Sequence, residues 1–377
     1  MPGASPVVWM NMTSSANWSR PPVGIIRVEQ VFWNELKKLY PSSQFKACYW
    51  KDGAFRKLVQ PIPQHFHGYS QAGDAIFRSG DVLISVGLDW DYPYYQKFYE
   101  LRKKGVHIVT FCHDLIPVIY PQYTHRYVAD KFASYLMEIA DASSLILCNS
   151  KQTEHDLRTF LDGAGARIPQ TMVVSFGDNI PEGSEAVSDQ VEKLLQERYI
   201  LYVSSIERRK NHEVLYRAYH RLCHDTEKHD QLPKLVFVGM PGWGVDELMN
   251  DINLDPLTHD LLVILNHVND AELNRLYEQA LFCVYPSLYE GWGLPIGEAL
   301  SLGKVVLASD RGSIPEVGGD LALYLDPWNP AAWAEEIWRL SNDPAAIKKL
   351  EDQIHTSYQP RKWTQTAKSI QEKLANL

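Results

Sequence analysis

Residues 285–325 read YPSLYEGWGLPIGEALSLGKVVLASDRGSIPEVGGDLALYL, and the rest of the chain is interpreted around this stretch. The apolar run at 281–285 predicts a buried parallel strand, and residues 296–302 have helical spacing. The turn between them contains Gly291, Gly293 and Pro295. A proline beside a helix start costs no hydrogen bond, because the first N–H groups of a helix have no partner inside it. Together with the positive end of the helix dipole, these N–H groups form a site for an anion.

Two glutamates flank this turn. Glu290 precedes the glycines and Glu298 lies in the predicted helix, with seven residues between them. Ligands of open parallel sheets bind beyond the carboxyl ends of the strands, where both carboxylates are expected to lie. The alternative interpretation is an ordinary strand-loop-helix unit with a solvated pair of glutamates.

The stretch resembles the signature of retaining glycosyltransferases of the family 4 type, which have the GT-B fold. The match is EGWGLPIGE at 290–298, and it continues through Ala299, Leu300, Gly303 and the segment IPEVGG at 314–319. The resemblance implies that Glu290 is catalytic and that the following residues bind a nucleotide-sugar donor: Gly291, Trp292, Gly293, Leu294 and Glu298.

Length and composition limit the class of protein. A chain of 377 residues favours two domains. The net charge of −9 and the pI near 5.8 argue against nucleic acid as a partner. We find no signal peptide pattern and no run of ~20 apolar residues, so the expected location is the cytoplasm, with at most peripheral contact at the inner face of a membrane. The five cysteines stand singly, and no pair has metal-ligand spacing.

Short apolar runs alternate with helical stretches along the whole chain, which is typical of doubly wound parallel sheets. Strands of a first sheet are expected at 6–10, 45–50, 82–86, 107–112, 145–149 and 172–175. After a polar linker at 179–197, a second set is expected at 199–204, 234–239, 261–265, 281–285, 305–309 and 321–325. The predicted fold class is α/β, with two Rossmann-like domains that face each other across a cleft as the GT-B resemblance implies. The predicted domains are 1–180 on the acceptor side, with 361–377 packed back on it, and 181–360 on the donor side.

Three consecutive cations follow the first strand of the second sheet, in the segment YVSSIERRKN at 202–211. Such a run is commonly a solvated surface. Here it resembles the strand-end Arg–Lys pair that holds the donor diphosphate in the family, which assigns Arg209 and Lys210 as catalytic cations. Ser205 occupies a donor-binding position where the family often has Arg or Thr, and the sequence leaves open whether Arg208 or Arg209 reaches the diphosphate.

Two positions in the first half match family site residues. His113, in the strand-end segment TFCHDLIP, resembles the family's His-Asp pair, which implies contact between the histidine and the donor sugar and leaves Asp114 open. Gly24 ends the loop before a predicted helix at 27–39 and resembles the family's glycine-containing first loop, which implies donor binding. The alternatives are a structural histidine and an ordinary surface loop.

The segment Asp89-Trp90-Asp91 has the form of the metal-binding Asp-x-Asp signature of a different glycosyltransferase fold. It is short, and it lies in the first half, away from the predicted donor domain. We therefore expect no metal and no other cofactor.

The predicted function is a metal-independent, retaining hexosyltransferase. It would move a hexose from a nucleotide-diphosphate sugar, of the UDP-glucose or GDP-mannose type, to a glycan or lipid-linked saccharide in cell-surface polysaccharide synthesis. The alternatives are another GT-B enzyme, such as a nucleotide-sugar epimerase or a glycogen-type synthase, and a catalytically inactive scaffold of the same fold.

Overall fold

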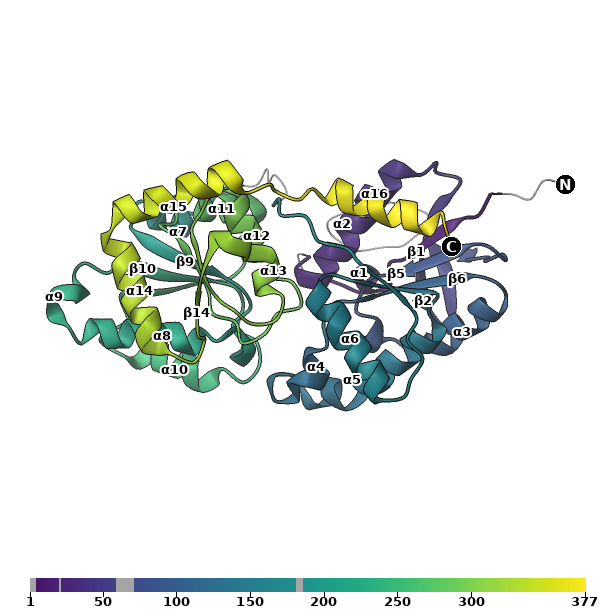
Figure 1. The fold of residues 1–377 in the computed structure, drawn as a ribbon, viewed down its shortest axis with the longest axis horizontal. Coiled ribbons are helices and arrows are strands. Elements are labelled where there is room, and N and C mark those ends of the chain that lie inside the picture. The colour runs from purple at the N-terminus through teal and green to yellow at the C-terminus, as the bar shows by residue number, and fades with distance from the viewer. Residues whose placement is uncertain (1–4, 20–21, 59–70, 181–185) are drawn as a thin grey trace. The chain divides into compact units, whose positions relative to one another are not determined.

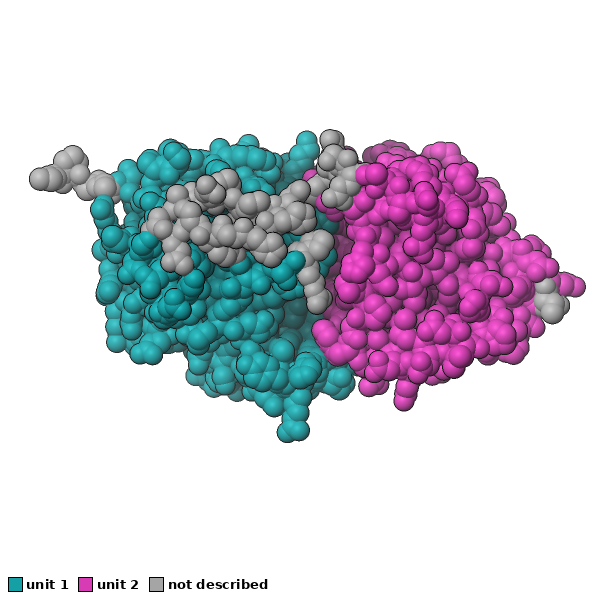
Figure 2. Space-filling model, turned by 180° about the vertical axis from the view of Figure 1, so that it is seen from behind, with its two compact units in different colours: residues 1–176, 362–377 teal, residues 177–361 magenta. Residues whose placement is uncertain are grey.

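The computed structural model describes residues 5–19, 22–58, 71–180 and 186–377. The chain divides into two compact units, residues 1–176 with 362–377 (unit 1) and residues 177–361 (unit 2). Figure 2 shows the two units in different colours. The predicted pair of doubly wound sheets is confirmed, because each unit has its own largely parallel sheet with helices around it (Figure 1).

The sheet of unit 1 has the strand order β4-β3-β2-β1-β5-β6-β7-β8. Its strands are β1 (Val8–Asn11), β2 (Phe45–Lys51), β3 (Ala54–Leu58), β4 (Gln71–Asp74), β5 (Val82–Ser85), β6 (His107–Cys112), β7 (Leu145–Cys148) and β8 (Gln170–Val173). The helices are α1 (Thr13–Ala16), α2 (Gly24–Leu39), η1 (Asp89–Asp91), α3 (Tyr95–Lys103), α4 (Ile116–Ile119), η2 (Pro121–Tyr123), α5 (Arg126–Ala142), α6 (Lys151–Gly163) and α16 (Trp363–Leu374).

One edge of this sheet was not predicted. β2 pairs with β3 and β3 with β4 in antiparallel fashion, whereas the other pairs of the sheet are parallel. The β2–β3 turn uses Asp52 and Gly53, both with positive φ (50° and 76°). Positive φ at both central residues is the geometry of a two-residue hairpin turn, which Asp-Gly adopts readily.

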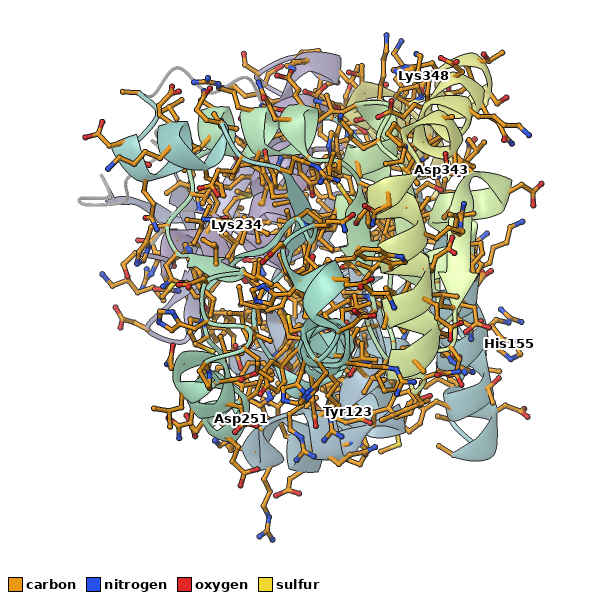
Figure 3. All side chains as sticks on the ribbon, turned by 90° about the vertical axis from the view of Figure 1, so that its left-hand side faces the viewer. Tyr123, His155, Lys234, Asp251, Asp343 and Lys348 are labelled. Carbon is orange, nitrogen blue, oxygen red and sulfur yellow. The ribbon has the colours of Figure 1, made fainter. Side chains whose placement is uncertain are left out.

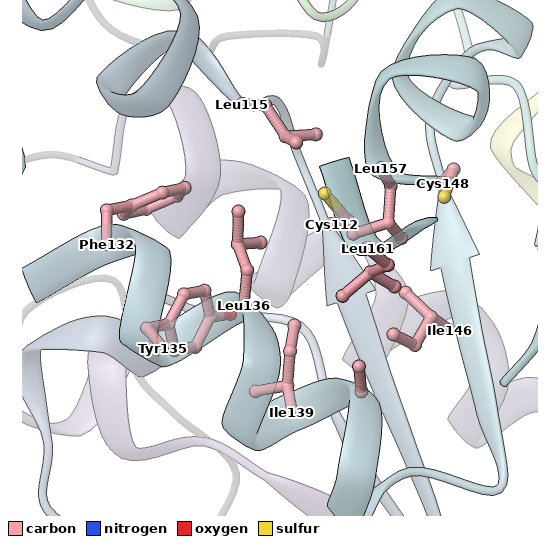
Figure 4. Close-up of a cluster of buried hydrophobic side chains, with 11 residues drawn as sticks. Cys112, Leu115, Phe132, Tyr135, Leu136, Ile139, Ile146, Cys148, Leu157 and Leu161 are labelled. Carbon is pink, nitrogen blue, oxygen red and sulfur yellow. The ribbon is translucent and has the colours of Figure 1, made fainter. Parts of the chain in front are cut away.

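The core of unit 1 lies between the sheet and its helices. One cluster of buried side chains, drawn in Figure 4, joins β6 and β7 to α5 and α6. It includes Cys112 and Cys148, and all five cysteines of the chain are buried and free, as expected for reduced core thiols. The C-terminal helix α16 packs on α2, where the Trp363 and Phe32 rings meet edge to face at 5.6 Å.

The sheet of unit 2 is parallel throughout, with the strand order β11-β10-β9-β12-β13-β14. Its strands are β9 (Tyr199–Val203), β10 (Lys234–Val238), β11 (Leu262–Leu265), β12 (Cys283–Tyr285), β13 (Val306–Ser309) and β14 (Ala322–Leu325). The helices are α7 (Asp189–Leu194), η3 (Arg208–Lys210), α8 (His212–Cys223), α9 (Thr226–His229), α10 (Asp246–Leu254), α11 (Asp270–Gln279), α12 (Leu294–Ser301), α13 (Ile314–Gly318), η4 (Gly319–Leu321), α14 (Pro330–Asn342) and α15 (Pro344–Ser357). The predicted linker at 179–197 lies partly outside the described residues, and its last part forms α7.

Polar side chains cover the outer helices of unit 2, as Asp343 and Lys348 of Figure 3 illustrate. Asp343 caps α15, because its carboxylate accepts a hydrogen bond of 2.9 Å from the Ala346 N–H, and Pro344 follows at the first helical position. Lys348 pairs with Asp352 one turn further along, at 2.7 Å on the surface. None of the helices in the described part of the chain is both long and apolar enough to cross a membrane.

Candidate functional site

The candidate site of unit 2 lies where the strand order of the sheet reverses. β9 is the first strand of this unit, and it lies between β10 and β12, so the chain leaves it toward one side and later returns on the other. Ligands of doubly wound sheets bind at this switch point, beyond the carboxyl ends of the strands. The loops that follow β9 and β12 carry the predicted cations and Glu290, respectively.

The turn after β12 is built for close backbone approach. Gly293 is the N-cap of α12 and has φ 107°, a left-handed conformation that favours glycine. Gly291 and Trp292 before it are buried, and Pro295 follows within the first turn of the helix. The helix begins at Leu294, two residues earlier than predicted, so its first turn lies within the segment between Glu290 and Glu298.

Glu290 is the centre of a buried ion cluster. Its carboxylate lies 2.6 Å from Lys210 Nζ and 2.9 Å from an Arg209 guanidinium nitrogen. Arg209 also pairs with Glu207 at 2.8 Å. All four side chains are at most 13% exposed. Two carboxylates thus balance two cations. The structure brings the predicted residues Arg209, Lys210 and Glu290 together in one ion cluster.

The cluster keeps Glu290 ionised. Burial by itself would raise the pKa of this carboxyl, but the charges of Arg209 and Lys210 and the hydrogen bond from Lys210 outweigh burial and lower the pKa to about 2. Glu290 is therefore a carboxylate at every pH at which the folded protein is expected to work.

The backbone joins the two loops that carry the cluster. The Leu288 N–H donates to the Arg209 carbonyl at 2.8 Å, and the Arg209 guanidinium donates to the Tyr289 carbonyl at 2.7 Å. The Tyr202 hydroxyl donates to the Lys210 carbonyl at 2.6 Å. These bonds fix the positions of both cations relative to Glu290.

A third loop, after β13, holds the backbone of Glu290. The Ser313 hydroxyl lies 3.0 Å from the Glu290 carbonyl and 2.9 Å from the Trp292 carbonyl, and the Ser313 N–H also donates to Glu290. Gly312 has φ 58°, and a Cβ there would lie 2.5 Å from the Glu290 carbonyl oxygen and 2.9 Å from its nitrogen. The close approach of these two loops therefore requires glycine at position 312.

We expect Gly312→Ala to lower the free energy of unfolding by about 2–5 kcal/mol, the sum of the left-handed backbone penalty and the overpacking cost. Urea unfolding followed by tryptophan fluorescence measures this loss. Gly165→Ala is the control, because Gly165 also has positive φ (62°) but open space around the position of a Cβ. Equal losses in the two variants would contradict the claim that contact with Glu290 sets the requirement.

The pKa of Glu290 also predicts how stability depends on pH. The folded value of about 2 lies below the ordinary value of 4.5, so the charge of Glu290 stabilises the fold fully above pH 4.5 and progressively less as the pH falls toward 2. We expect the stability advantage of wild type over Glu290→Gln to be smaller at pH 3 than at pH 6 by about 2 kcal/mol. Urea titrations of both proteins at the two pH values measure it, and an advantage independent of pH would refute the ion cluster.

Glu298 lies on α12, the helix that follows the Glu290 loop. It is 4% exposed, and its carboxylate accepts a hydrogen bond of 3.1 Å from the Tyr277 hydroxyl of α11. The structure therefore places the two glutamates of the sequence pattern differently, Glu290 among cations and Glu298 against a phenol.

The structure separates the two adjacent arginines. Arg209 points into the cluster, whereas the exposed Arg208 has its side-chain stem near Gly244, where a Cβ would lie 3.2 Å from the Arg208 Cδ. Ser205 is exposed, and its hydroxyl contacts Glu207 at 3.4 Å. Glu207 was not predicted as a site residue, although it stands in the same IERRK run.

In unit 1, His113 lies beside the point where that sheet reverses, between β1 and β5. Its ring stacks on Phe111 at 4.5 Å, and Nε2 lies 2.8 Å from the Val86 carbonyl, which follows β5. Because a carbonyl only accepts, Nε2 carries the proton and Nδ1 is left as an acceptor. Burial lowers the pKa of His113 to about 4, so the ring is neutral at pH 7. Asp114 caps the next turn by accepting from the Ile116 N–H at 2.9 Å.

The other residues predicted in unit 1 have these positions. Gly24 is exposed and opens α2 with φ 51°. The buried Asp89 accepts hydrogen bonds from Ser85 and Tyr94, and Asp91 pairs with Lys131 at 3.3 Å. Within the described residues no group of three or more His, Cys, Asp or Glu side chains is arranged to hold a metal ion.

A polar cluster beside the switch point of unit 1, between β1 and β5, was not predicted. Glu29 of α2 is buried, its carboxylate accepts from the Ser15 N–H at 2.6 Å, and burial raises its pKa to about 8. Gly87 passes so close to Ser14 and Glu29 that it leaves no room for a Cβ. Glu29 was not predicted, although it stands three residues after Ile26 and three before Phe32, on the apolar face of the amphipathic helix α2.

The chain is similar in sequence to known glycosyltransferases. The model of the family "Glycosyl transferases group 1" matches residues 184–359. O-antigen chain mannosyltransferase B of Escherichia coli is 32% identical over 239 residues, which are 63% of this chain and 62% of that protein. The serotype-specific mannosyltransferase WbdA of Escherichia coli is 24% identical over 372 residues, 94% of this chain and 44% of that protein. The chain thus spans less than two thirds of the length of either relative.

The fold has close counterparts among solved structures. Anabaena Alr3699/HepE, solved in complex with UDP-glucose, superposes with a TM-score of 0.67 at 16% identity, over 98% of this chain and 99% of that one. At this identity the likeness concerns the fold. The family resemblance predicted from residues 285–325 is confirmed: residues 184–359, with the whole ion cluster, are a glycosyl transferases group 1 domain, and the fold of the chain is GT-B.

Proposed function

We propose that the chain is a retaining mannosyltransferase that moves mannose from GDP-mannose to a glycan or lipid-linked acceptor in polysaccharide synthesis. The observation that carries the proposal is the ion cluster of Glu290, Arg209 and Lys210 at the switch point of the group 1 domain. The choice of mannose rests on the names of both Escherichia coli relatives. UDP-glucose is the second candidate donor, favoured by the complex of Alr3699/HepE.

The two cations would supply most of the catalytic stabilisation. The barrier lies in breaking the anomeric C–O bond while negative charge builds on the leaving diphosphate, and preorganised charges at that place are usually the largest catalytic contribution. Arg209 and Lys210 are held in place by bonds to the neighbouring loop and strand, so they need not reorganise during the reaction. The N–H groups of the first turn of α12, near Gly293 and Leu294, would add to the same effect.

The two glutamates would have separate roles. Glu298, which accepts a hydrogen bond from Tyr277, would also accept hydrogen bonds from the ribose hydroxyls. Glu290 would bind hydroxyls of the donor sugar and, as a carboxylate, support the positive charge that develops at the anomeric carbon. In a retaining reaction without a covalent intermediate, the acceptor hydroxyl attacks the face that the diphosphate leaves and gives its proton to a phosphate oxygen.

His113 and Gly24 of unit 1 would have the roles in the proposed reaction that the family resemblance implies. A neutral histidine with an unprotonated Nδ1 is suited to accept a hydrogen bond from a sugar hydroxyl. Gly24 has no side chain to block an approaching phosphate or acceptor. These two roles, like the cytoplasmic location, stay predictions.

A thermal-shift screen with UDP, GDP, ADP and their sugars tests the choice of donor. A ligand at 100 times its dissociation constant stabilises the folded state by about 2.7 kcal/mol, so the matching nucleotide is easily recognised. We expect GDP and GDP-mannose to raise the melting temperature most. A shift with UDP and UDP-glucose alone would replace mannose by glucose, and slow hydrolysis of any sugar donor would exclude an inactive scaffold. A nucleotide-sugar epimerase would be revealed by a changed sugar in the absence of an acceptor.

We further propose that no metal ion is needed, because protein cations occupy the place where the diphosphate is expected. The expected result is that donor binding and turnover survive EDTA. Turnover that vanishes with the chelator and returns with Mn²⁺ would refute this, and it would return attention to Asp89 and Asp91, whose carboxylates contact Tyr94 and Lys131 in the present structure.

A further inference from the structure

The chain passes between the two units twice, at residues 176–177 and at residues 361–362. Asp178 and Arg361 stand just inside unit 2 at these two crossings. Their side chains form an ion pair with a closest distance of 3.0 Å, and the Asp178 carboxylate also accepts from the Arg361 N–H at 2.8 Å. In return, the Asp178 N–H donates to the Arg361 carbonyl at 3.0 Å. Both crossings therefore enter unit 2 at a single fixed place.

On the unit 1 side, the two crossings are also joined. Phe176 and Trp363 stack with ring centroids 5.2 Å apart, and Phe32 packs against both rings. Between the ring pair and the ion pair, the first crossing has only Gly177 and the second only Lys362. The two connections are thus one residue long, with a fixed point at each end.

The ion pair is also attached to the loop that carries Glu290. The Arg361 guanidinium lies over the Trp292 ring at 4.9 Å, and Trp292 is two residues from Glu290. The Asp178 carboxylate lies so close to Gly297 of α12 that a Cβ has no room there, and the Ser301 hydroxyl at the end of α12 contacts the Asp178 carbonyl at 3.3 Å. The Asp178 carboxylate is therefore built into the packing of the helix that bears Glu298.

A buried ion pair is weak support for stability, because desolvation offsets much of the attraction and apolar residues often serve as well. Asp178 is 1% exposed and receives five hydrogen bonds on its carboxylate, from Tyr358 and Arg361. A directional network at this place fixes geometry more strictly than apolar packing does. Hinges of two-domain proteins are likewise a few residues at the ends of elements that absorb the change in φ and ψ.

We propose that Asp178 and Arg361 are positioning residues, which tie both crossings to the donor loop and confine the hinge between the units to Gly177 and Lys362. The hinge would then lie next to Trp292 and α12, whose positions the pair also fixes. The activity part of the test rests on the proposed transfer reaction, whereas the binding and shape measurements do not.

The experiment compares Asp178→Asn and Arg361→Gln with wild type in the full chain. We expect kcat for sugar transfer to fall about 10- to 100-fold, the size of effect that a misplacement of about 1 Å produces. GDP affinity, measured by titration calorimetry, should fall less than kcat does, because Arg209, Lys210 and Glu290 keep their contacts, although Trp292 and α12 pack against the pair. Small-angle X-ray scattering with GDP present should give a larger radius of gyration in both variants. Residues that only stabilised the fold would not lower kcat more than they lower GDP affinity.

Glu351→Gln is the matched control, because it removes the carboxylate of another partly buried ion pair of unit 2, with Lys304 at 3.7 Å. Arg361→Lys keeps the charge but loses the planar guanidinium group that donates to both carboxylate oxygens. It replaces Asp178→Asn in the experiment if that variant does not fold. Kinetics and scattering equal to those of Glu351→Gln would overturn the proposal, as would a loss of GDP affinity as large as the loss of kcat. If wild type transfers no sugar from any donor, the proposed function fails, and the scattering comparison alone decides the role of the pair.

Discussion

Glu290→Gln is expected to lower kcat for sugar transfer by about 10²–10³-fold, the loss seen when one preorganised electrostatic group is removed from a transition state. The change keeps the shape of the side chain and removes its charge, whose proposed catalytic role is to support the positive charge that develops at the anomeric carbon. An interaction that strengthens in the transition state raises kcat rather than ground-state affinity. Steady-state kinetics with the sugar donor measure the effect.

The same variant should bind GDP at least as tightly as wild type does. In the present structure, the Glu290 carboxylate contacts both Lys210 and Arg209 at 2.6 and 2.9 Å, so it competes with a diphosphate for the two cations. Glu298→Gln is the counterpart, because loss of a ribose contact made in both states should mainly raise the donor KM. Equal losses of GDP affinity in the two variants would show that this division of roles is wrong.

Lys210→Ala is expected to weaken GDP binding about 10- to 100-fold, because a hydrogen bond to a charged group is worth ~1.5–3 kcal/mol. The Lys210 side chain is 12% exposed and bonded to Glu290, so its loss removes one of the two cations that face the expected diphosphate. Titration calorimetry with GDP measures the change without any need for an acceptor.

Arg208→Ala is the matched control for this prediction. The neighbouring arginine has the same charge and stands in the same short helix η3, but its side chain runs toward Gly244 rather than Glu290. We expect its GDP affinity to remain within about twofold of wild type. Unchanged affinity in Lys210→Ala, or an equal loss in Arg208→Ala, would mean that the diphosphate binds elsewhere.

The general plan of both units could be predicted from the sequence, because buried parallel strands are short apolar runs and helices alternate with them. The contact between the loops after β9 and β12 follows from the same logic, since the carboxyl ends of neighbouring parallel strands meet at one edge. The antiparallel edge of unit 1 was missed. Its turn carries a readable Asp52-Gly53 signal, but β4 (QAGD) is too short and polar to show any apolar alternation.

Other features cannot be read from a single sequence. Arg208 and Arg209 are adjacent in a 3₁₀ turn of about three residues per turn, so their side chains point in very different directions and only the structure tells them apart. Asp178 and Arg361 lie 183 residues apart, and no local period or spacing connects them. Glu29, by contrast, carries a readable signal, because it stands at helical spacing from the apolar residues Ile26 and Phe32 and a charge on that face is expected to be buried.

The most direct test of the central claim is a transfer reaction with GDP-mannose and a mannose-terminated oligosaccharide, followed by NMR of the anomeric proton of the product. The α-linked donor is predicted to give an α-linked mannoside with stoichiometric release of GDP, and Glu290→Gln is predicted to lose almost all of this activity. A β-linked product would contradict retention. Release of GDP at the same rate by wild type and Glu290→Gln would contradict the assignment of the ion cluster as the catalytic site.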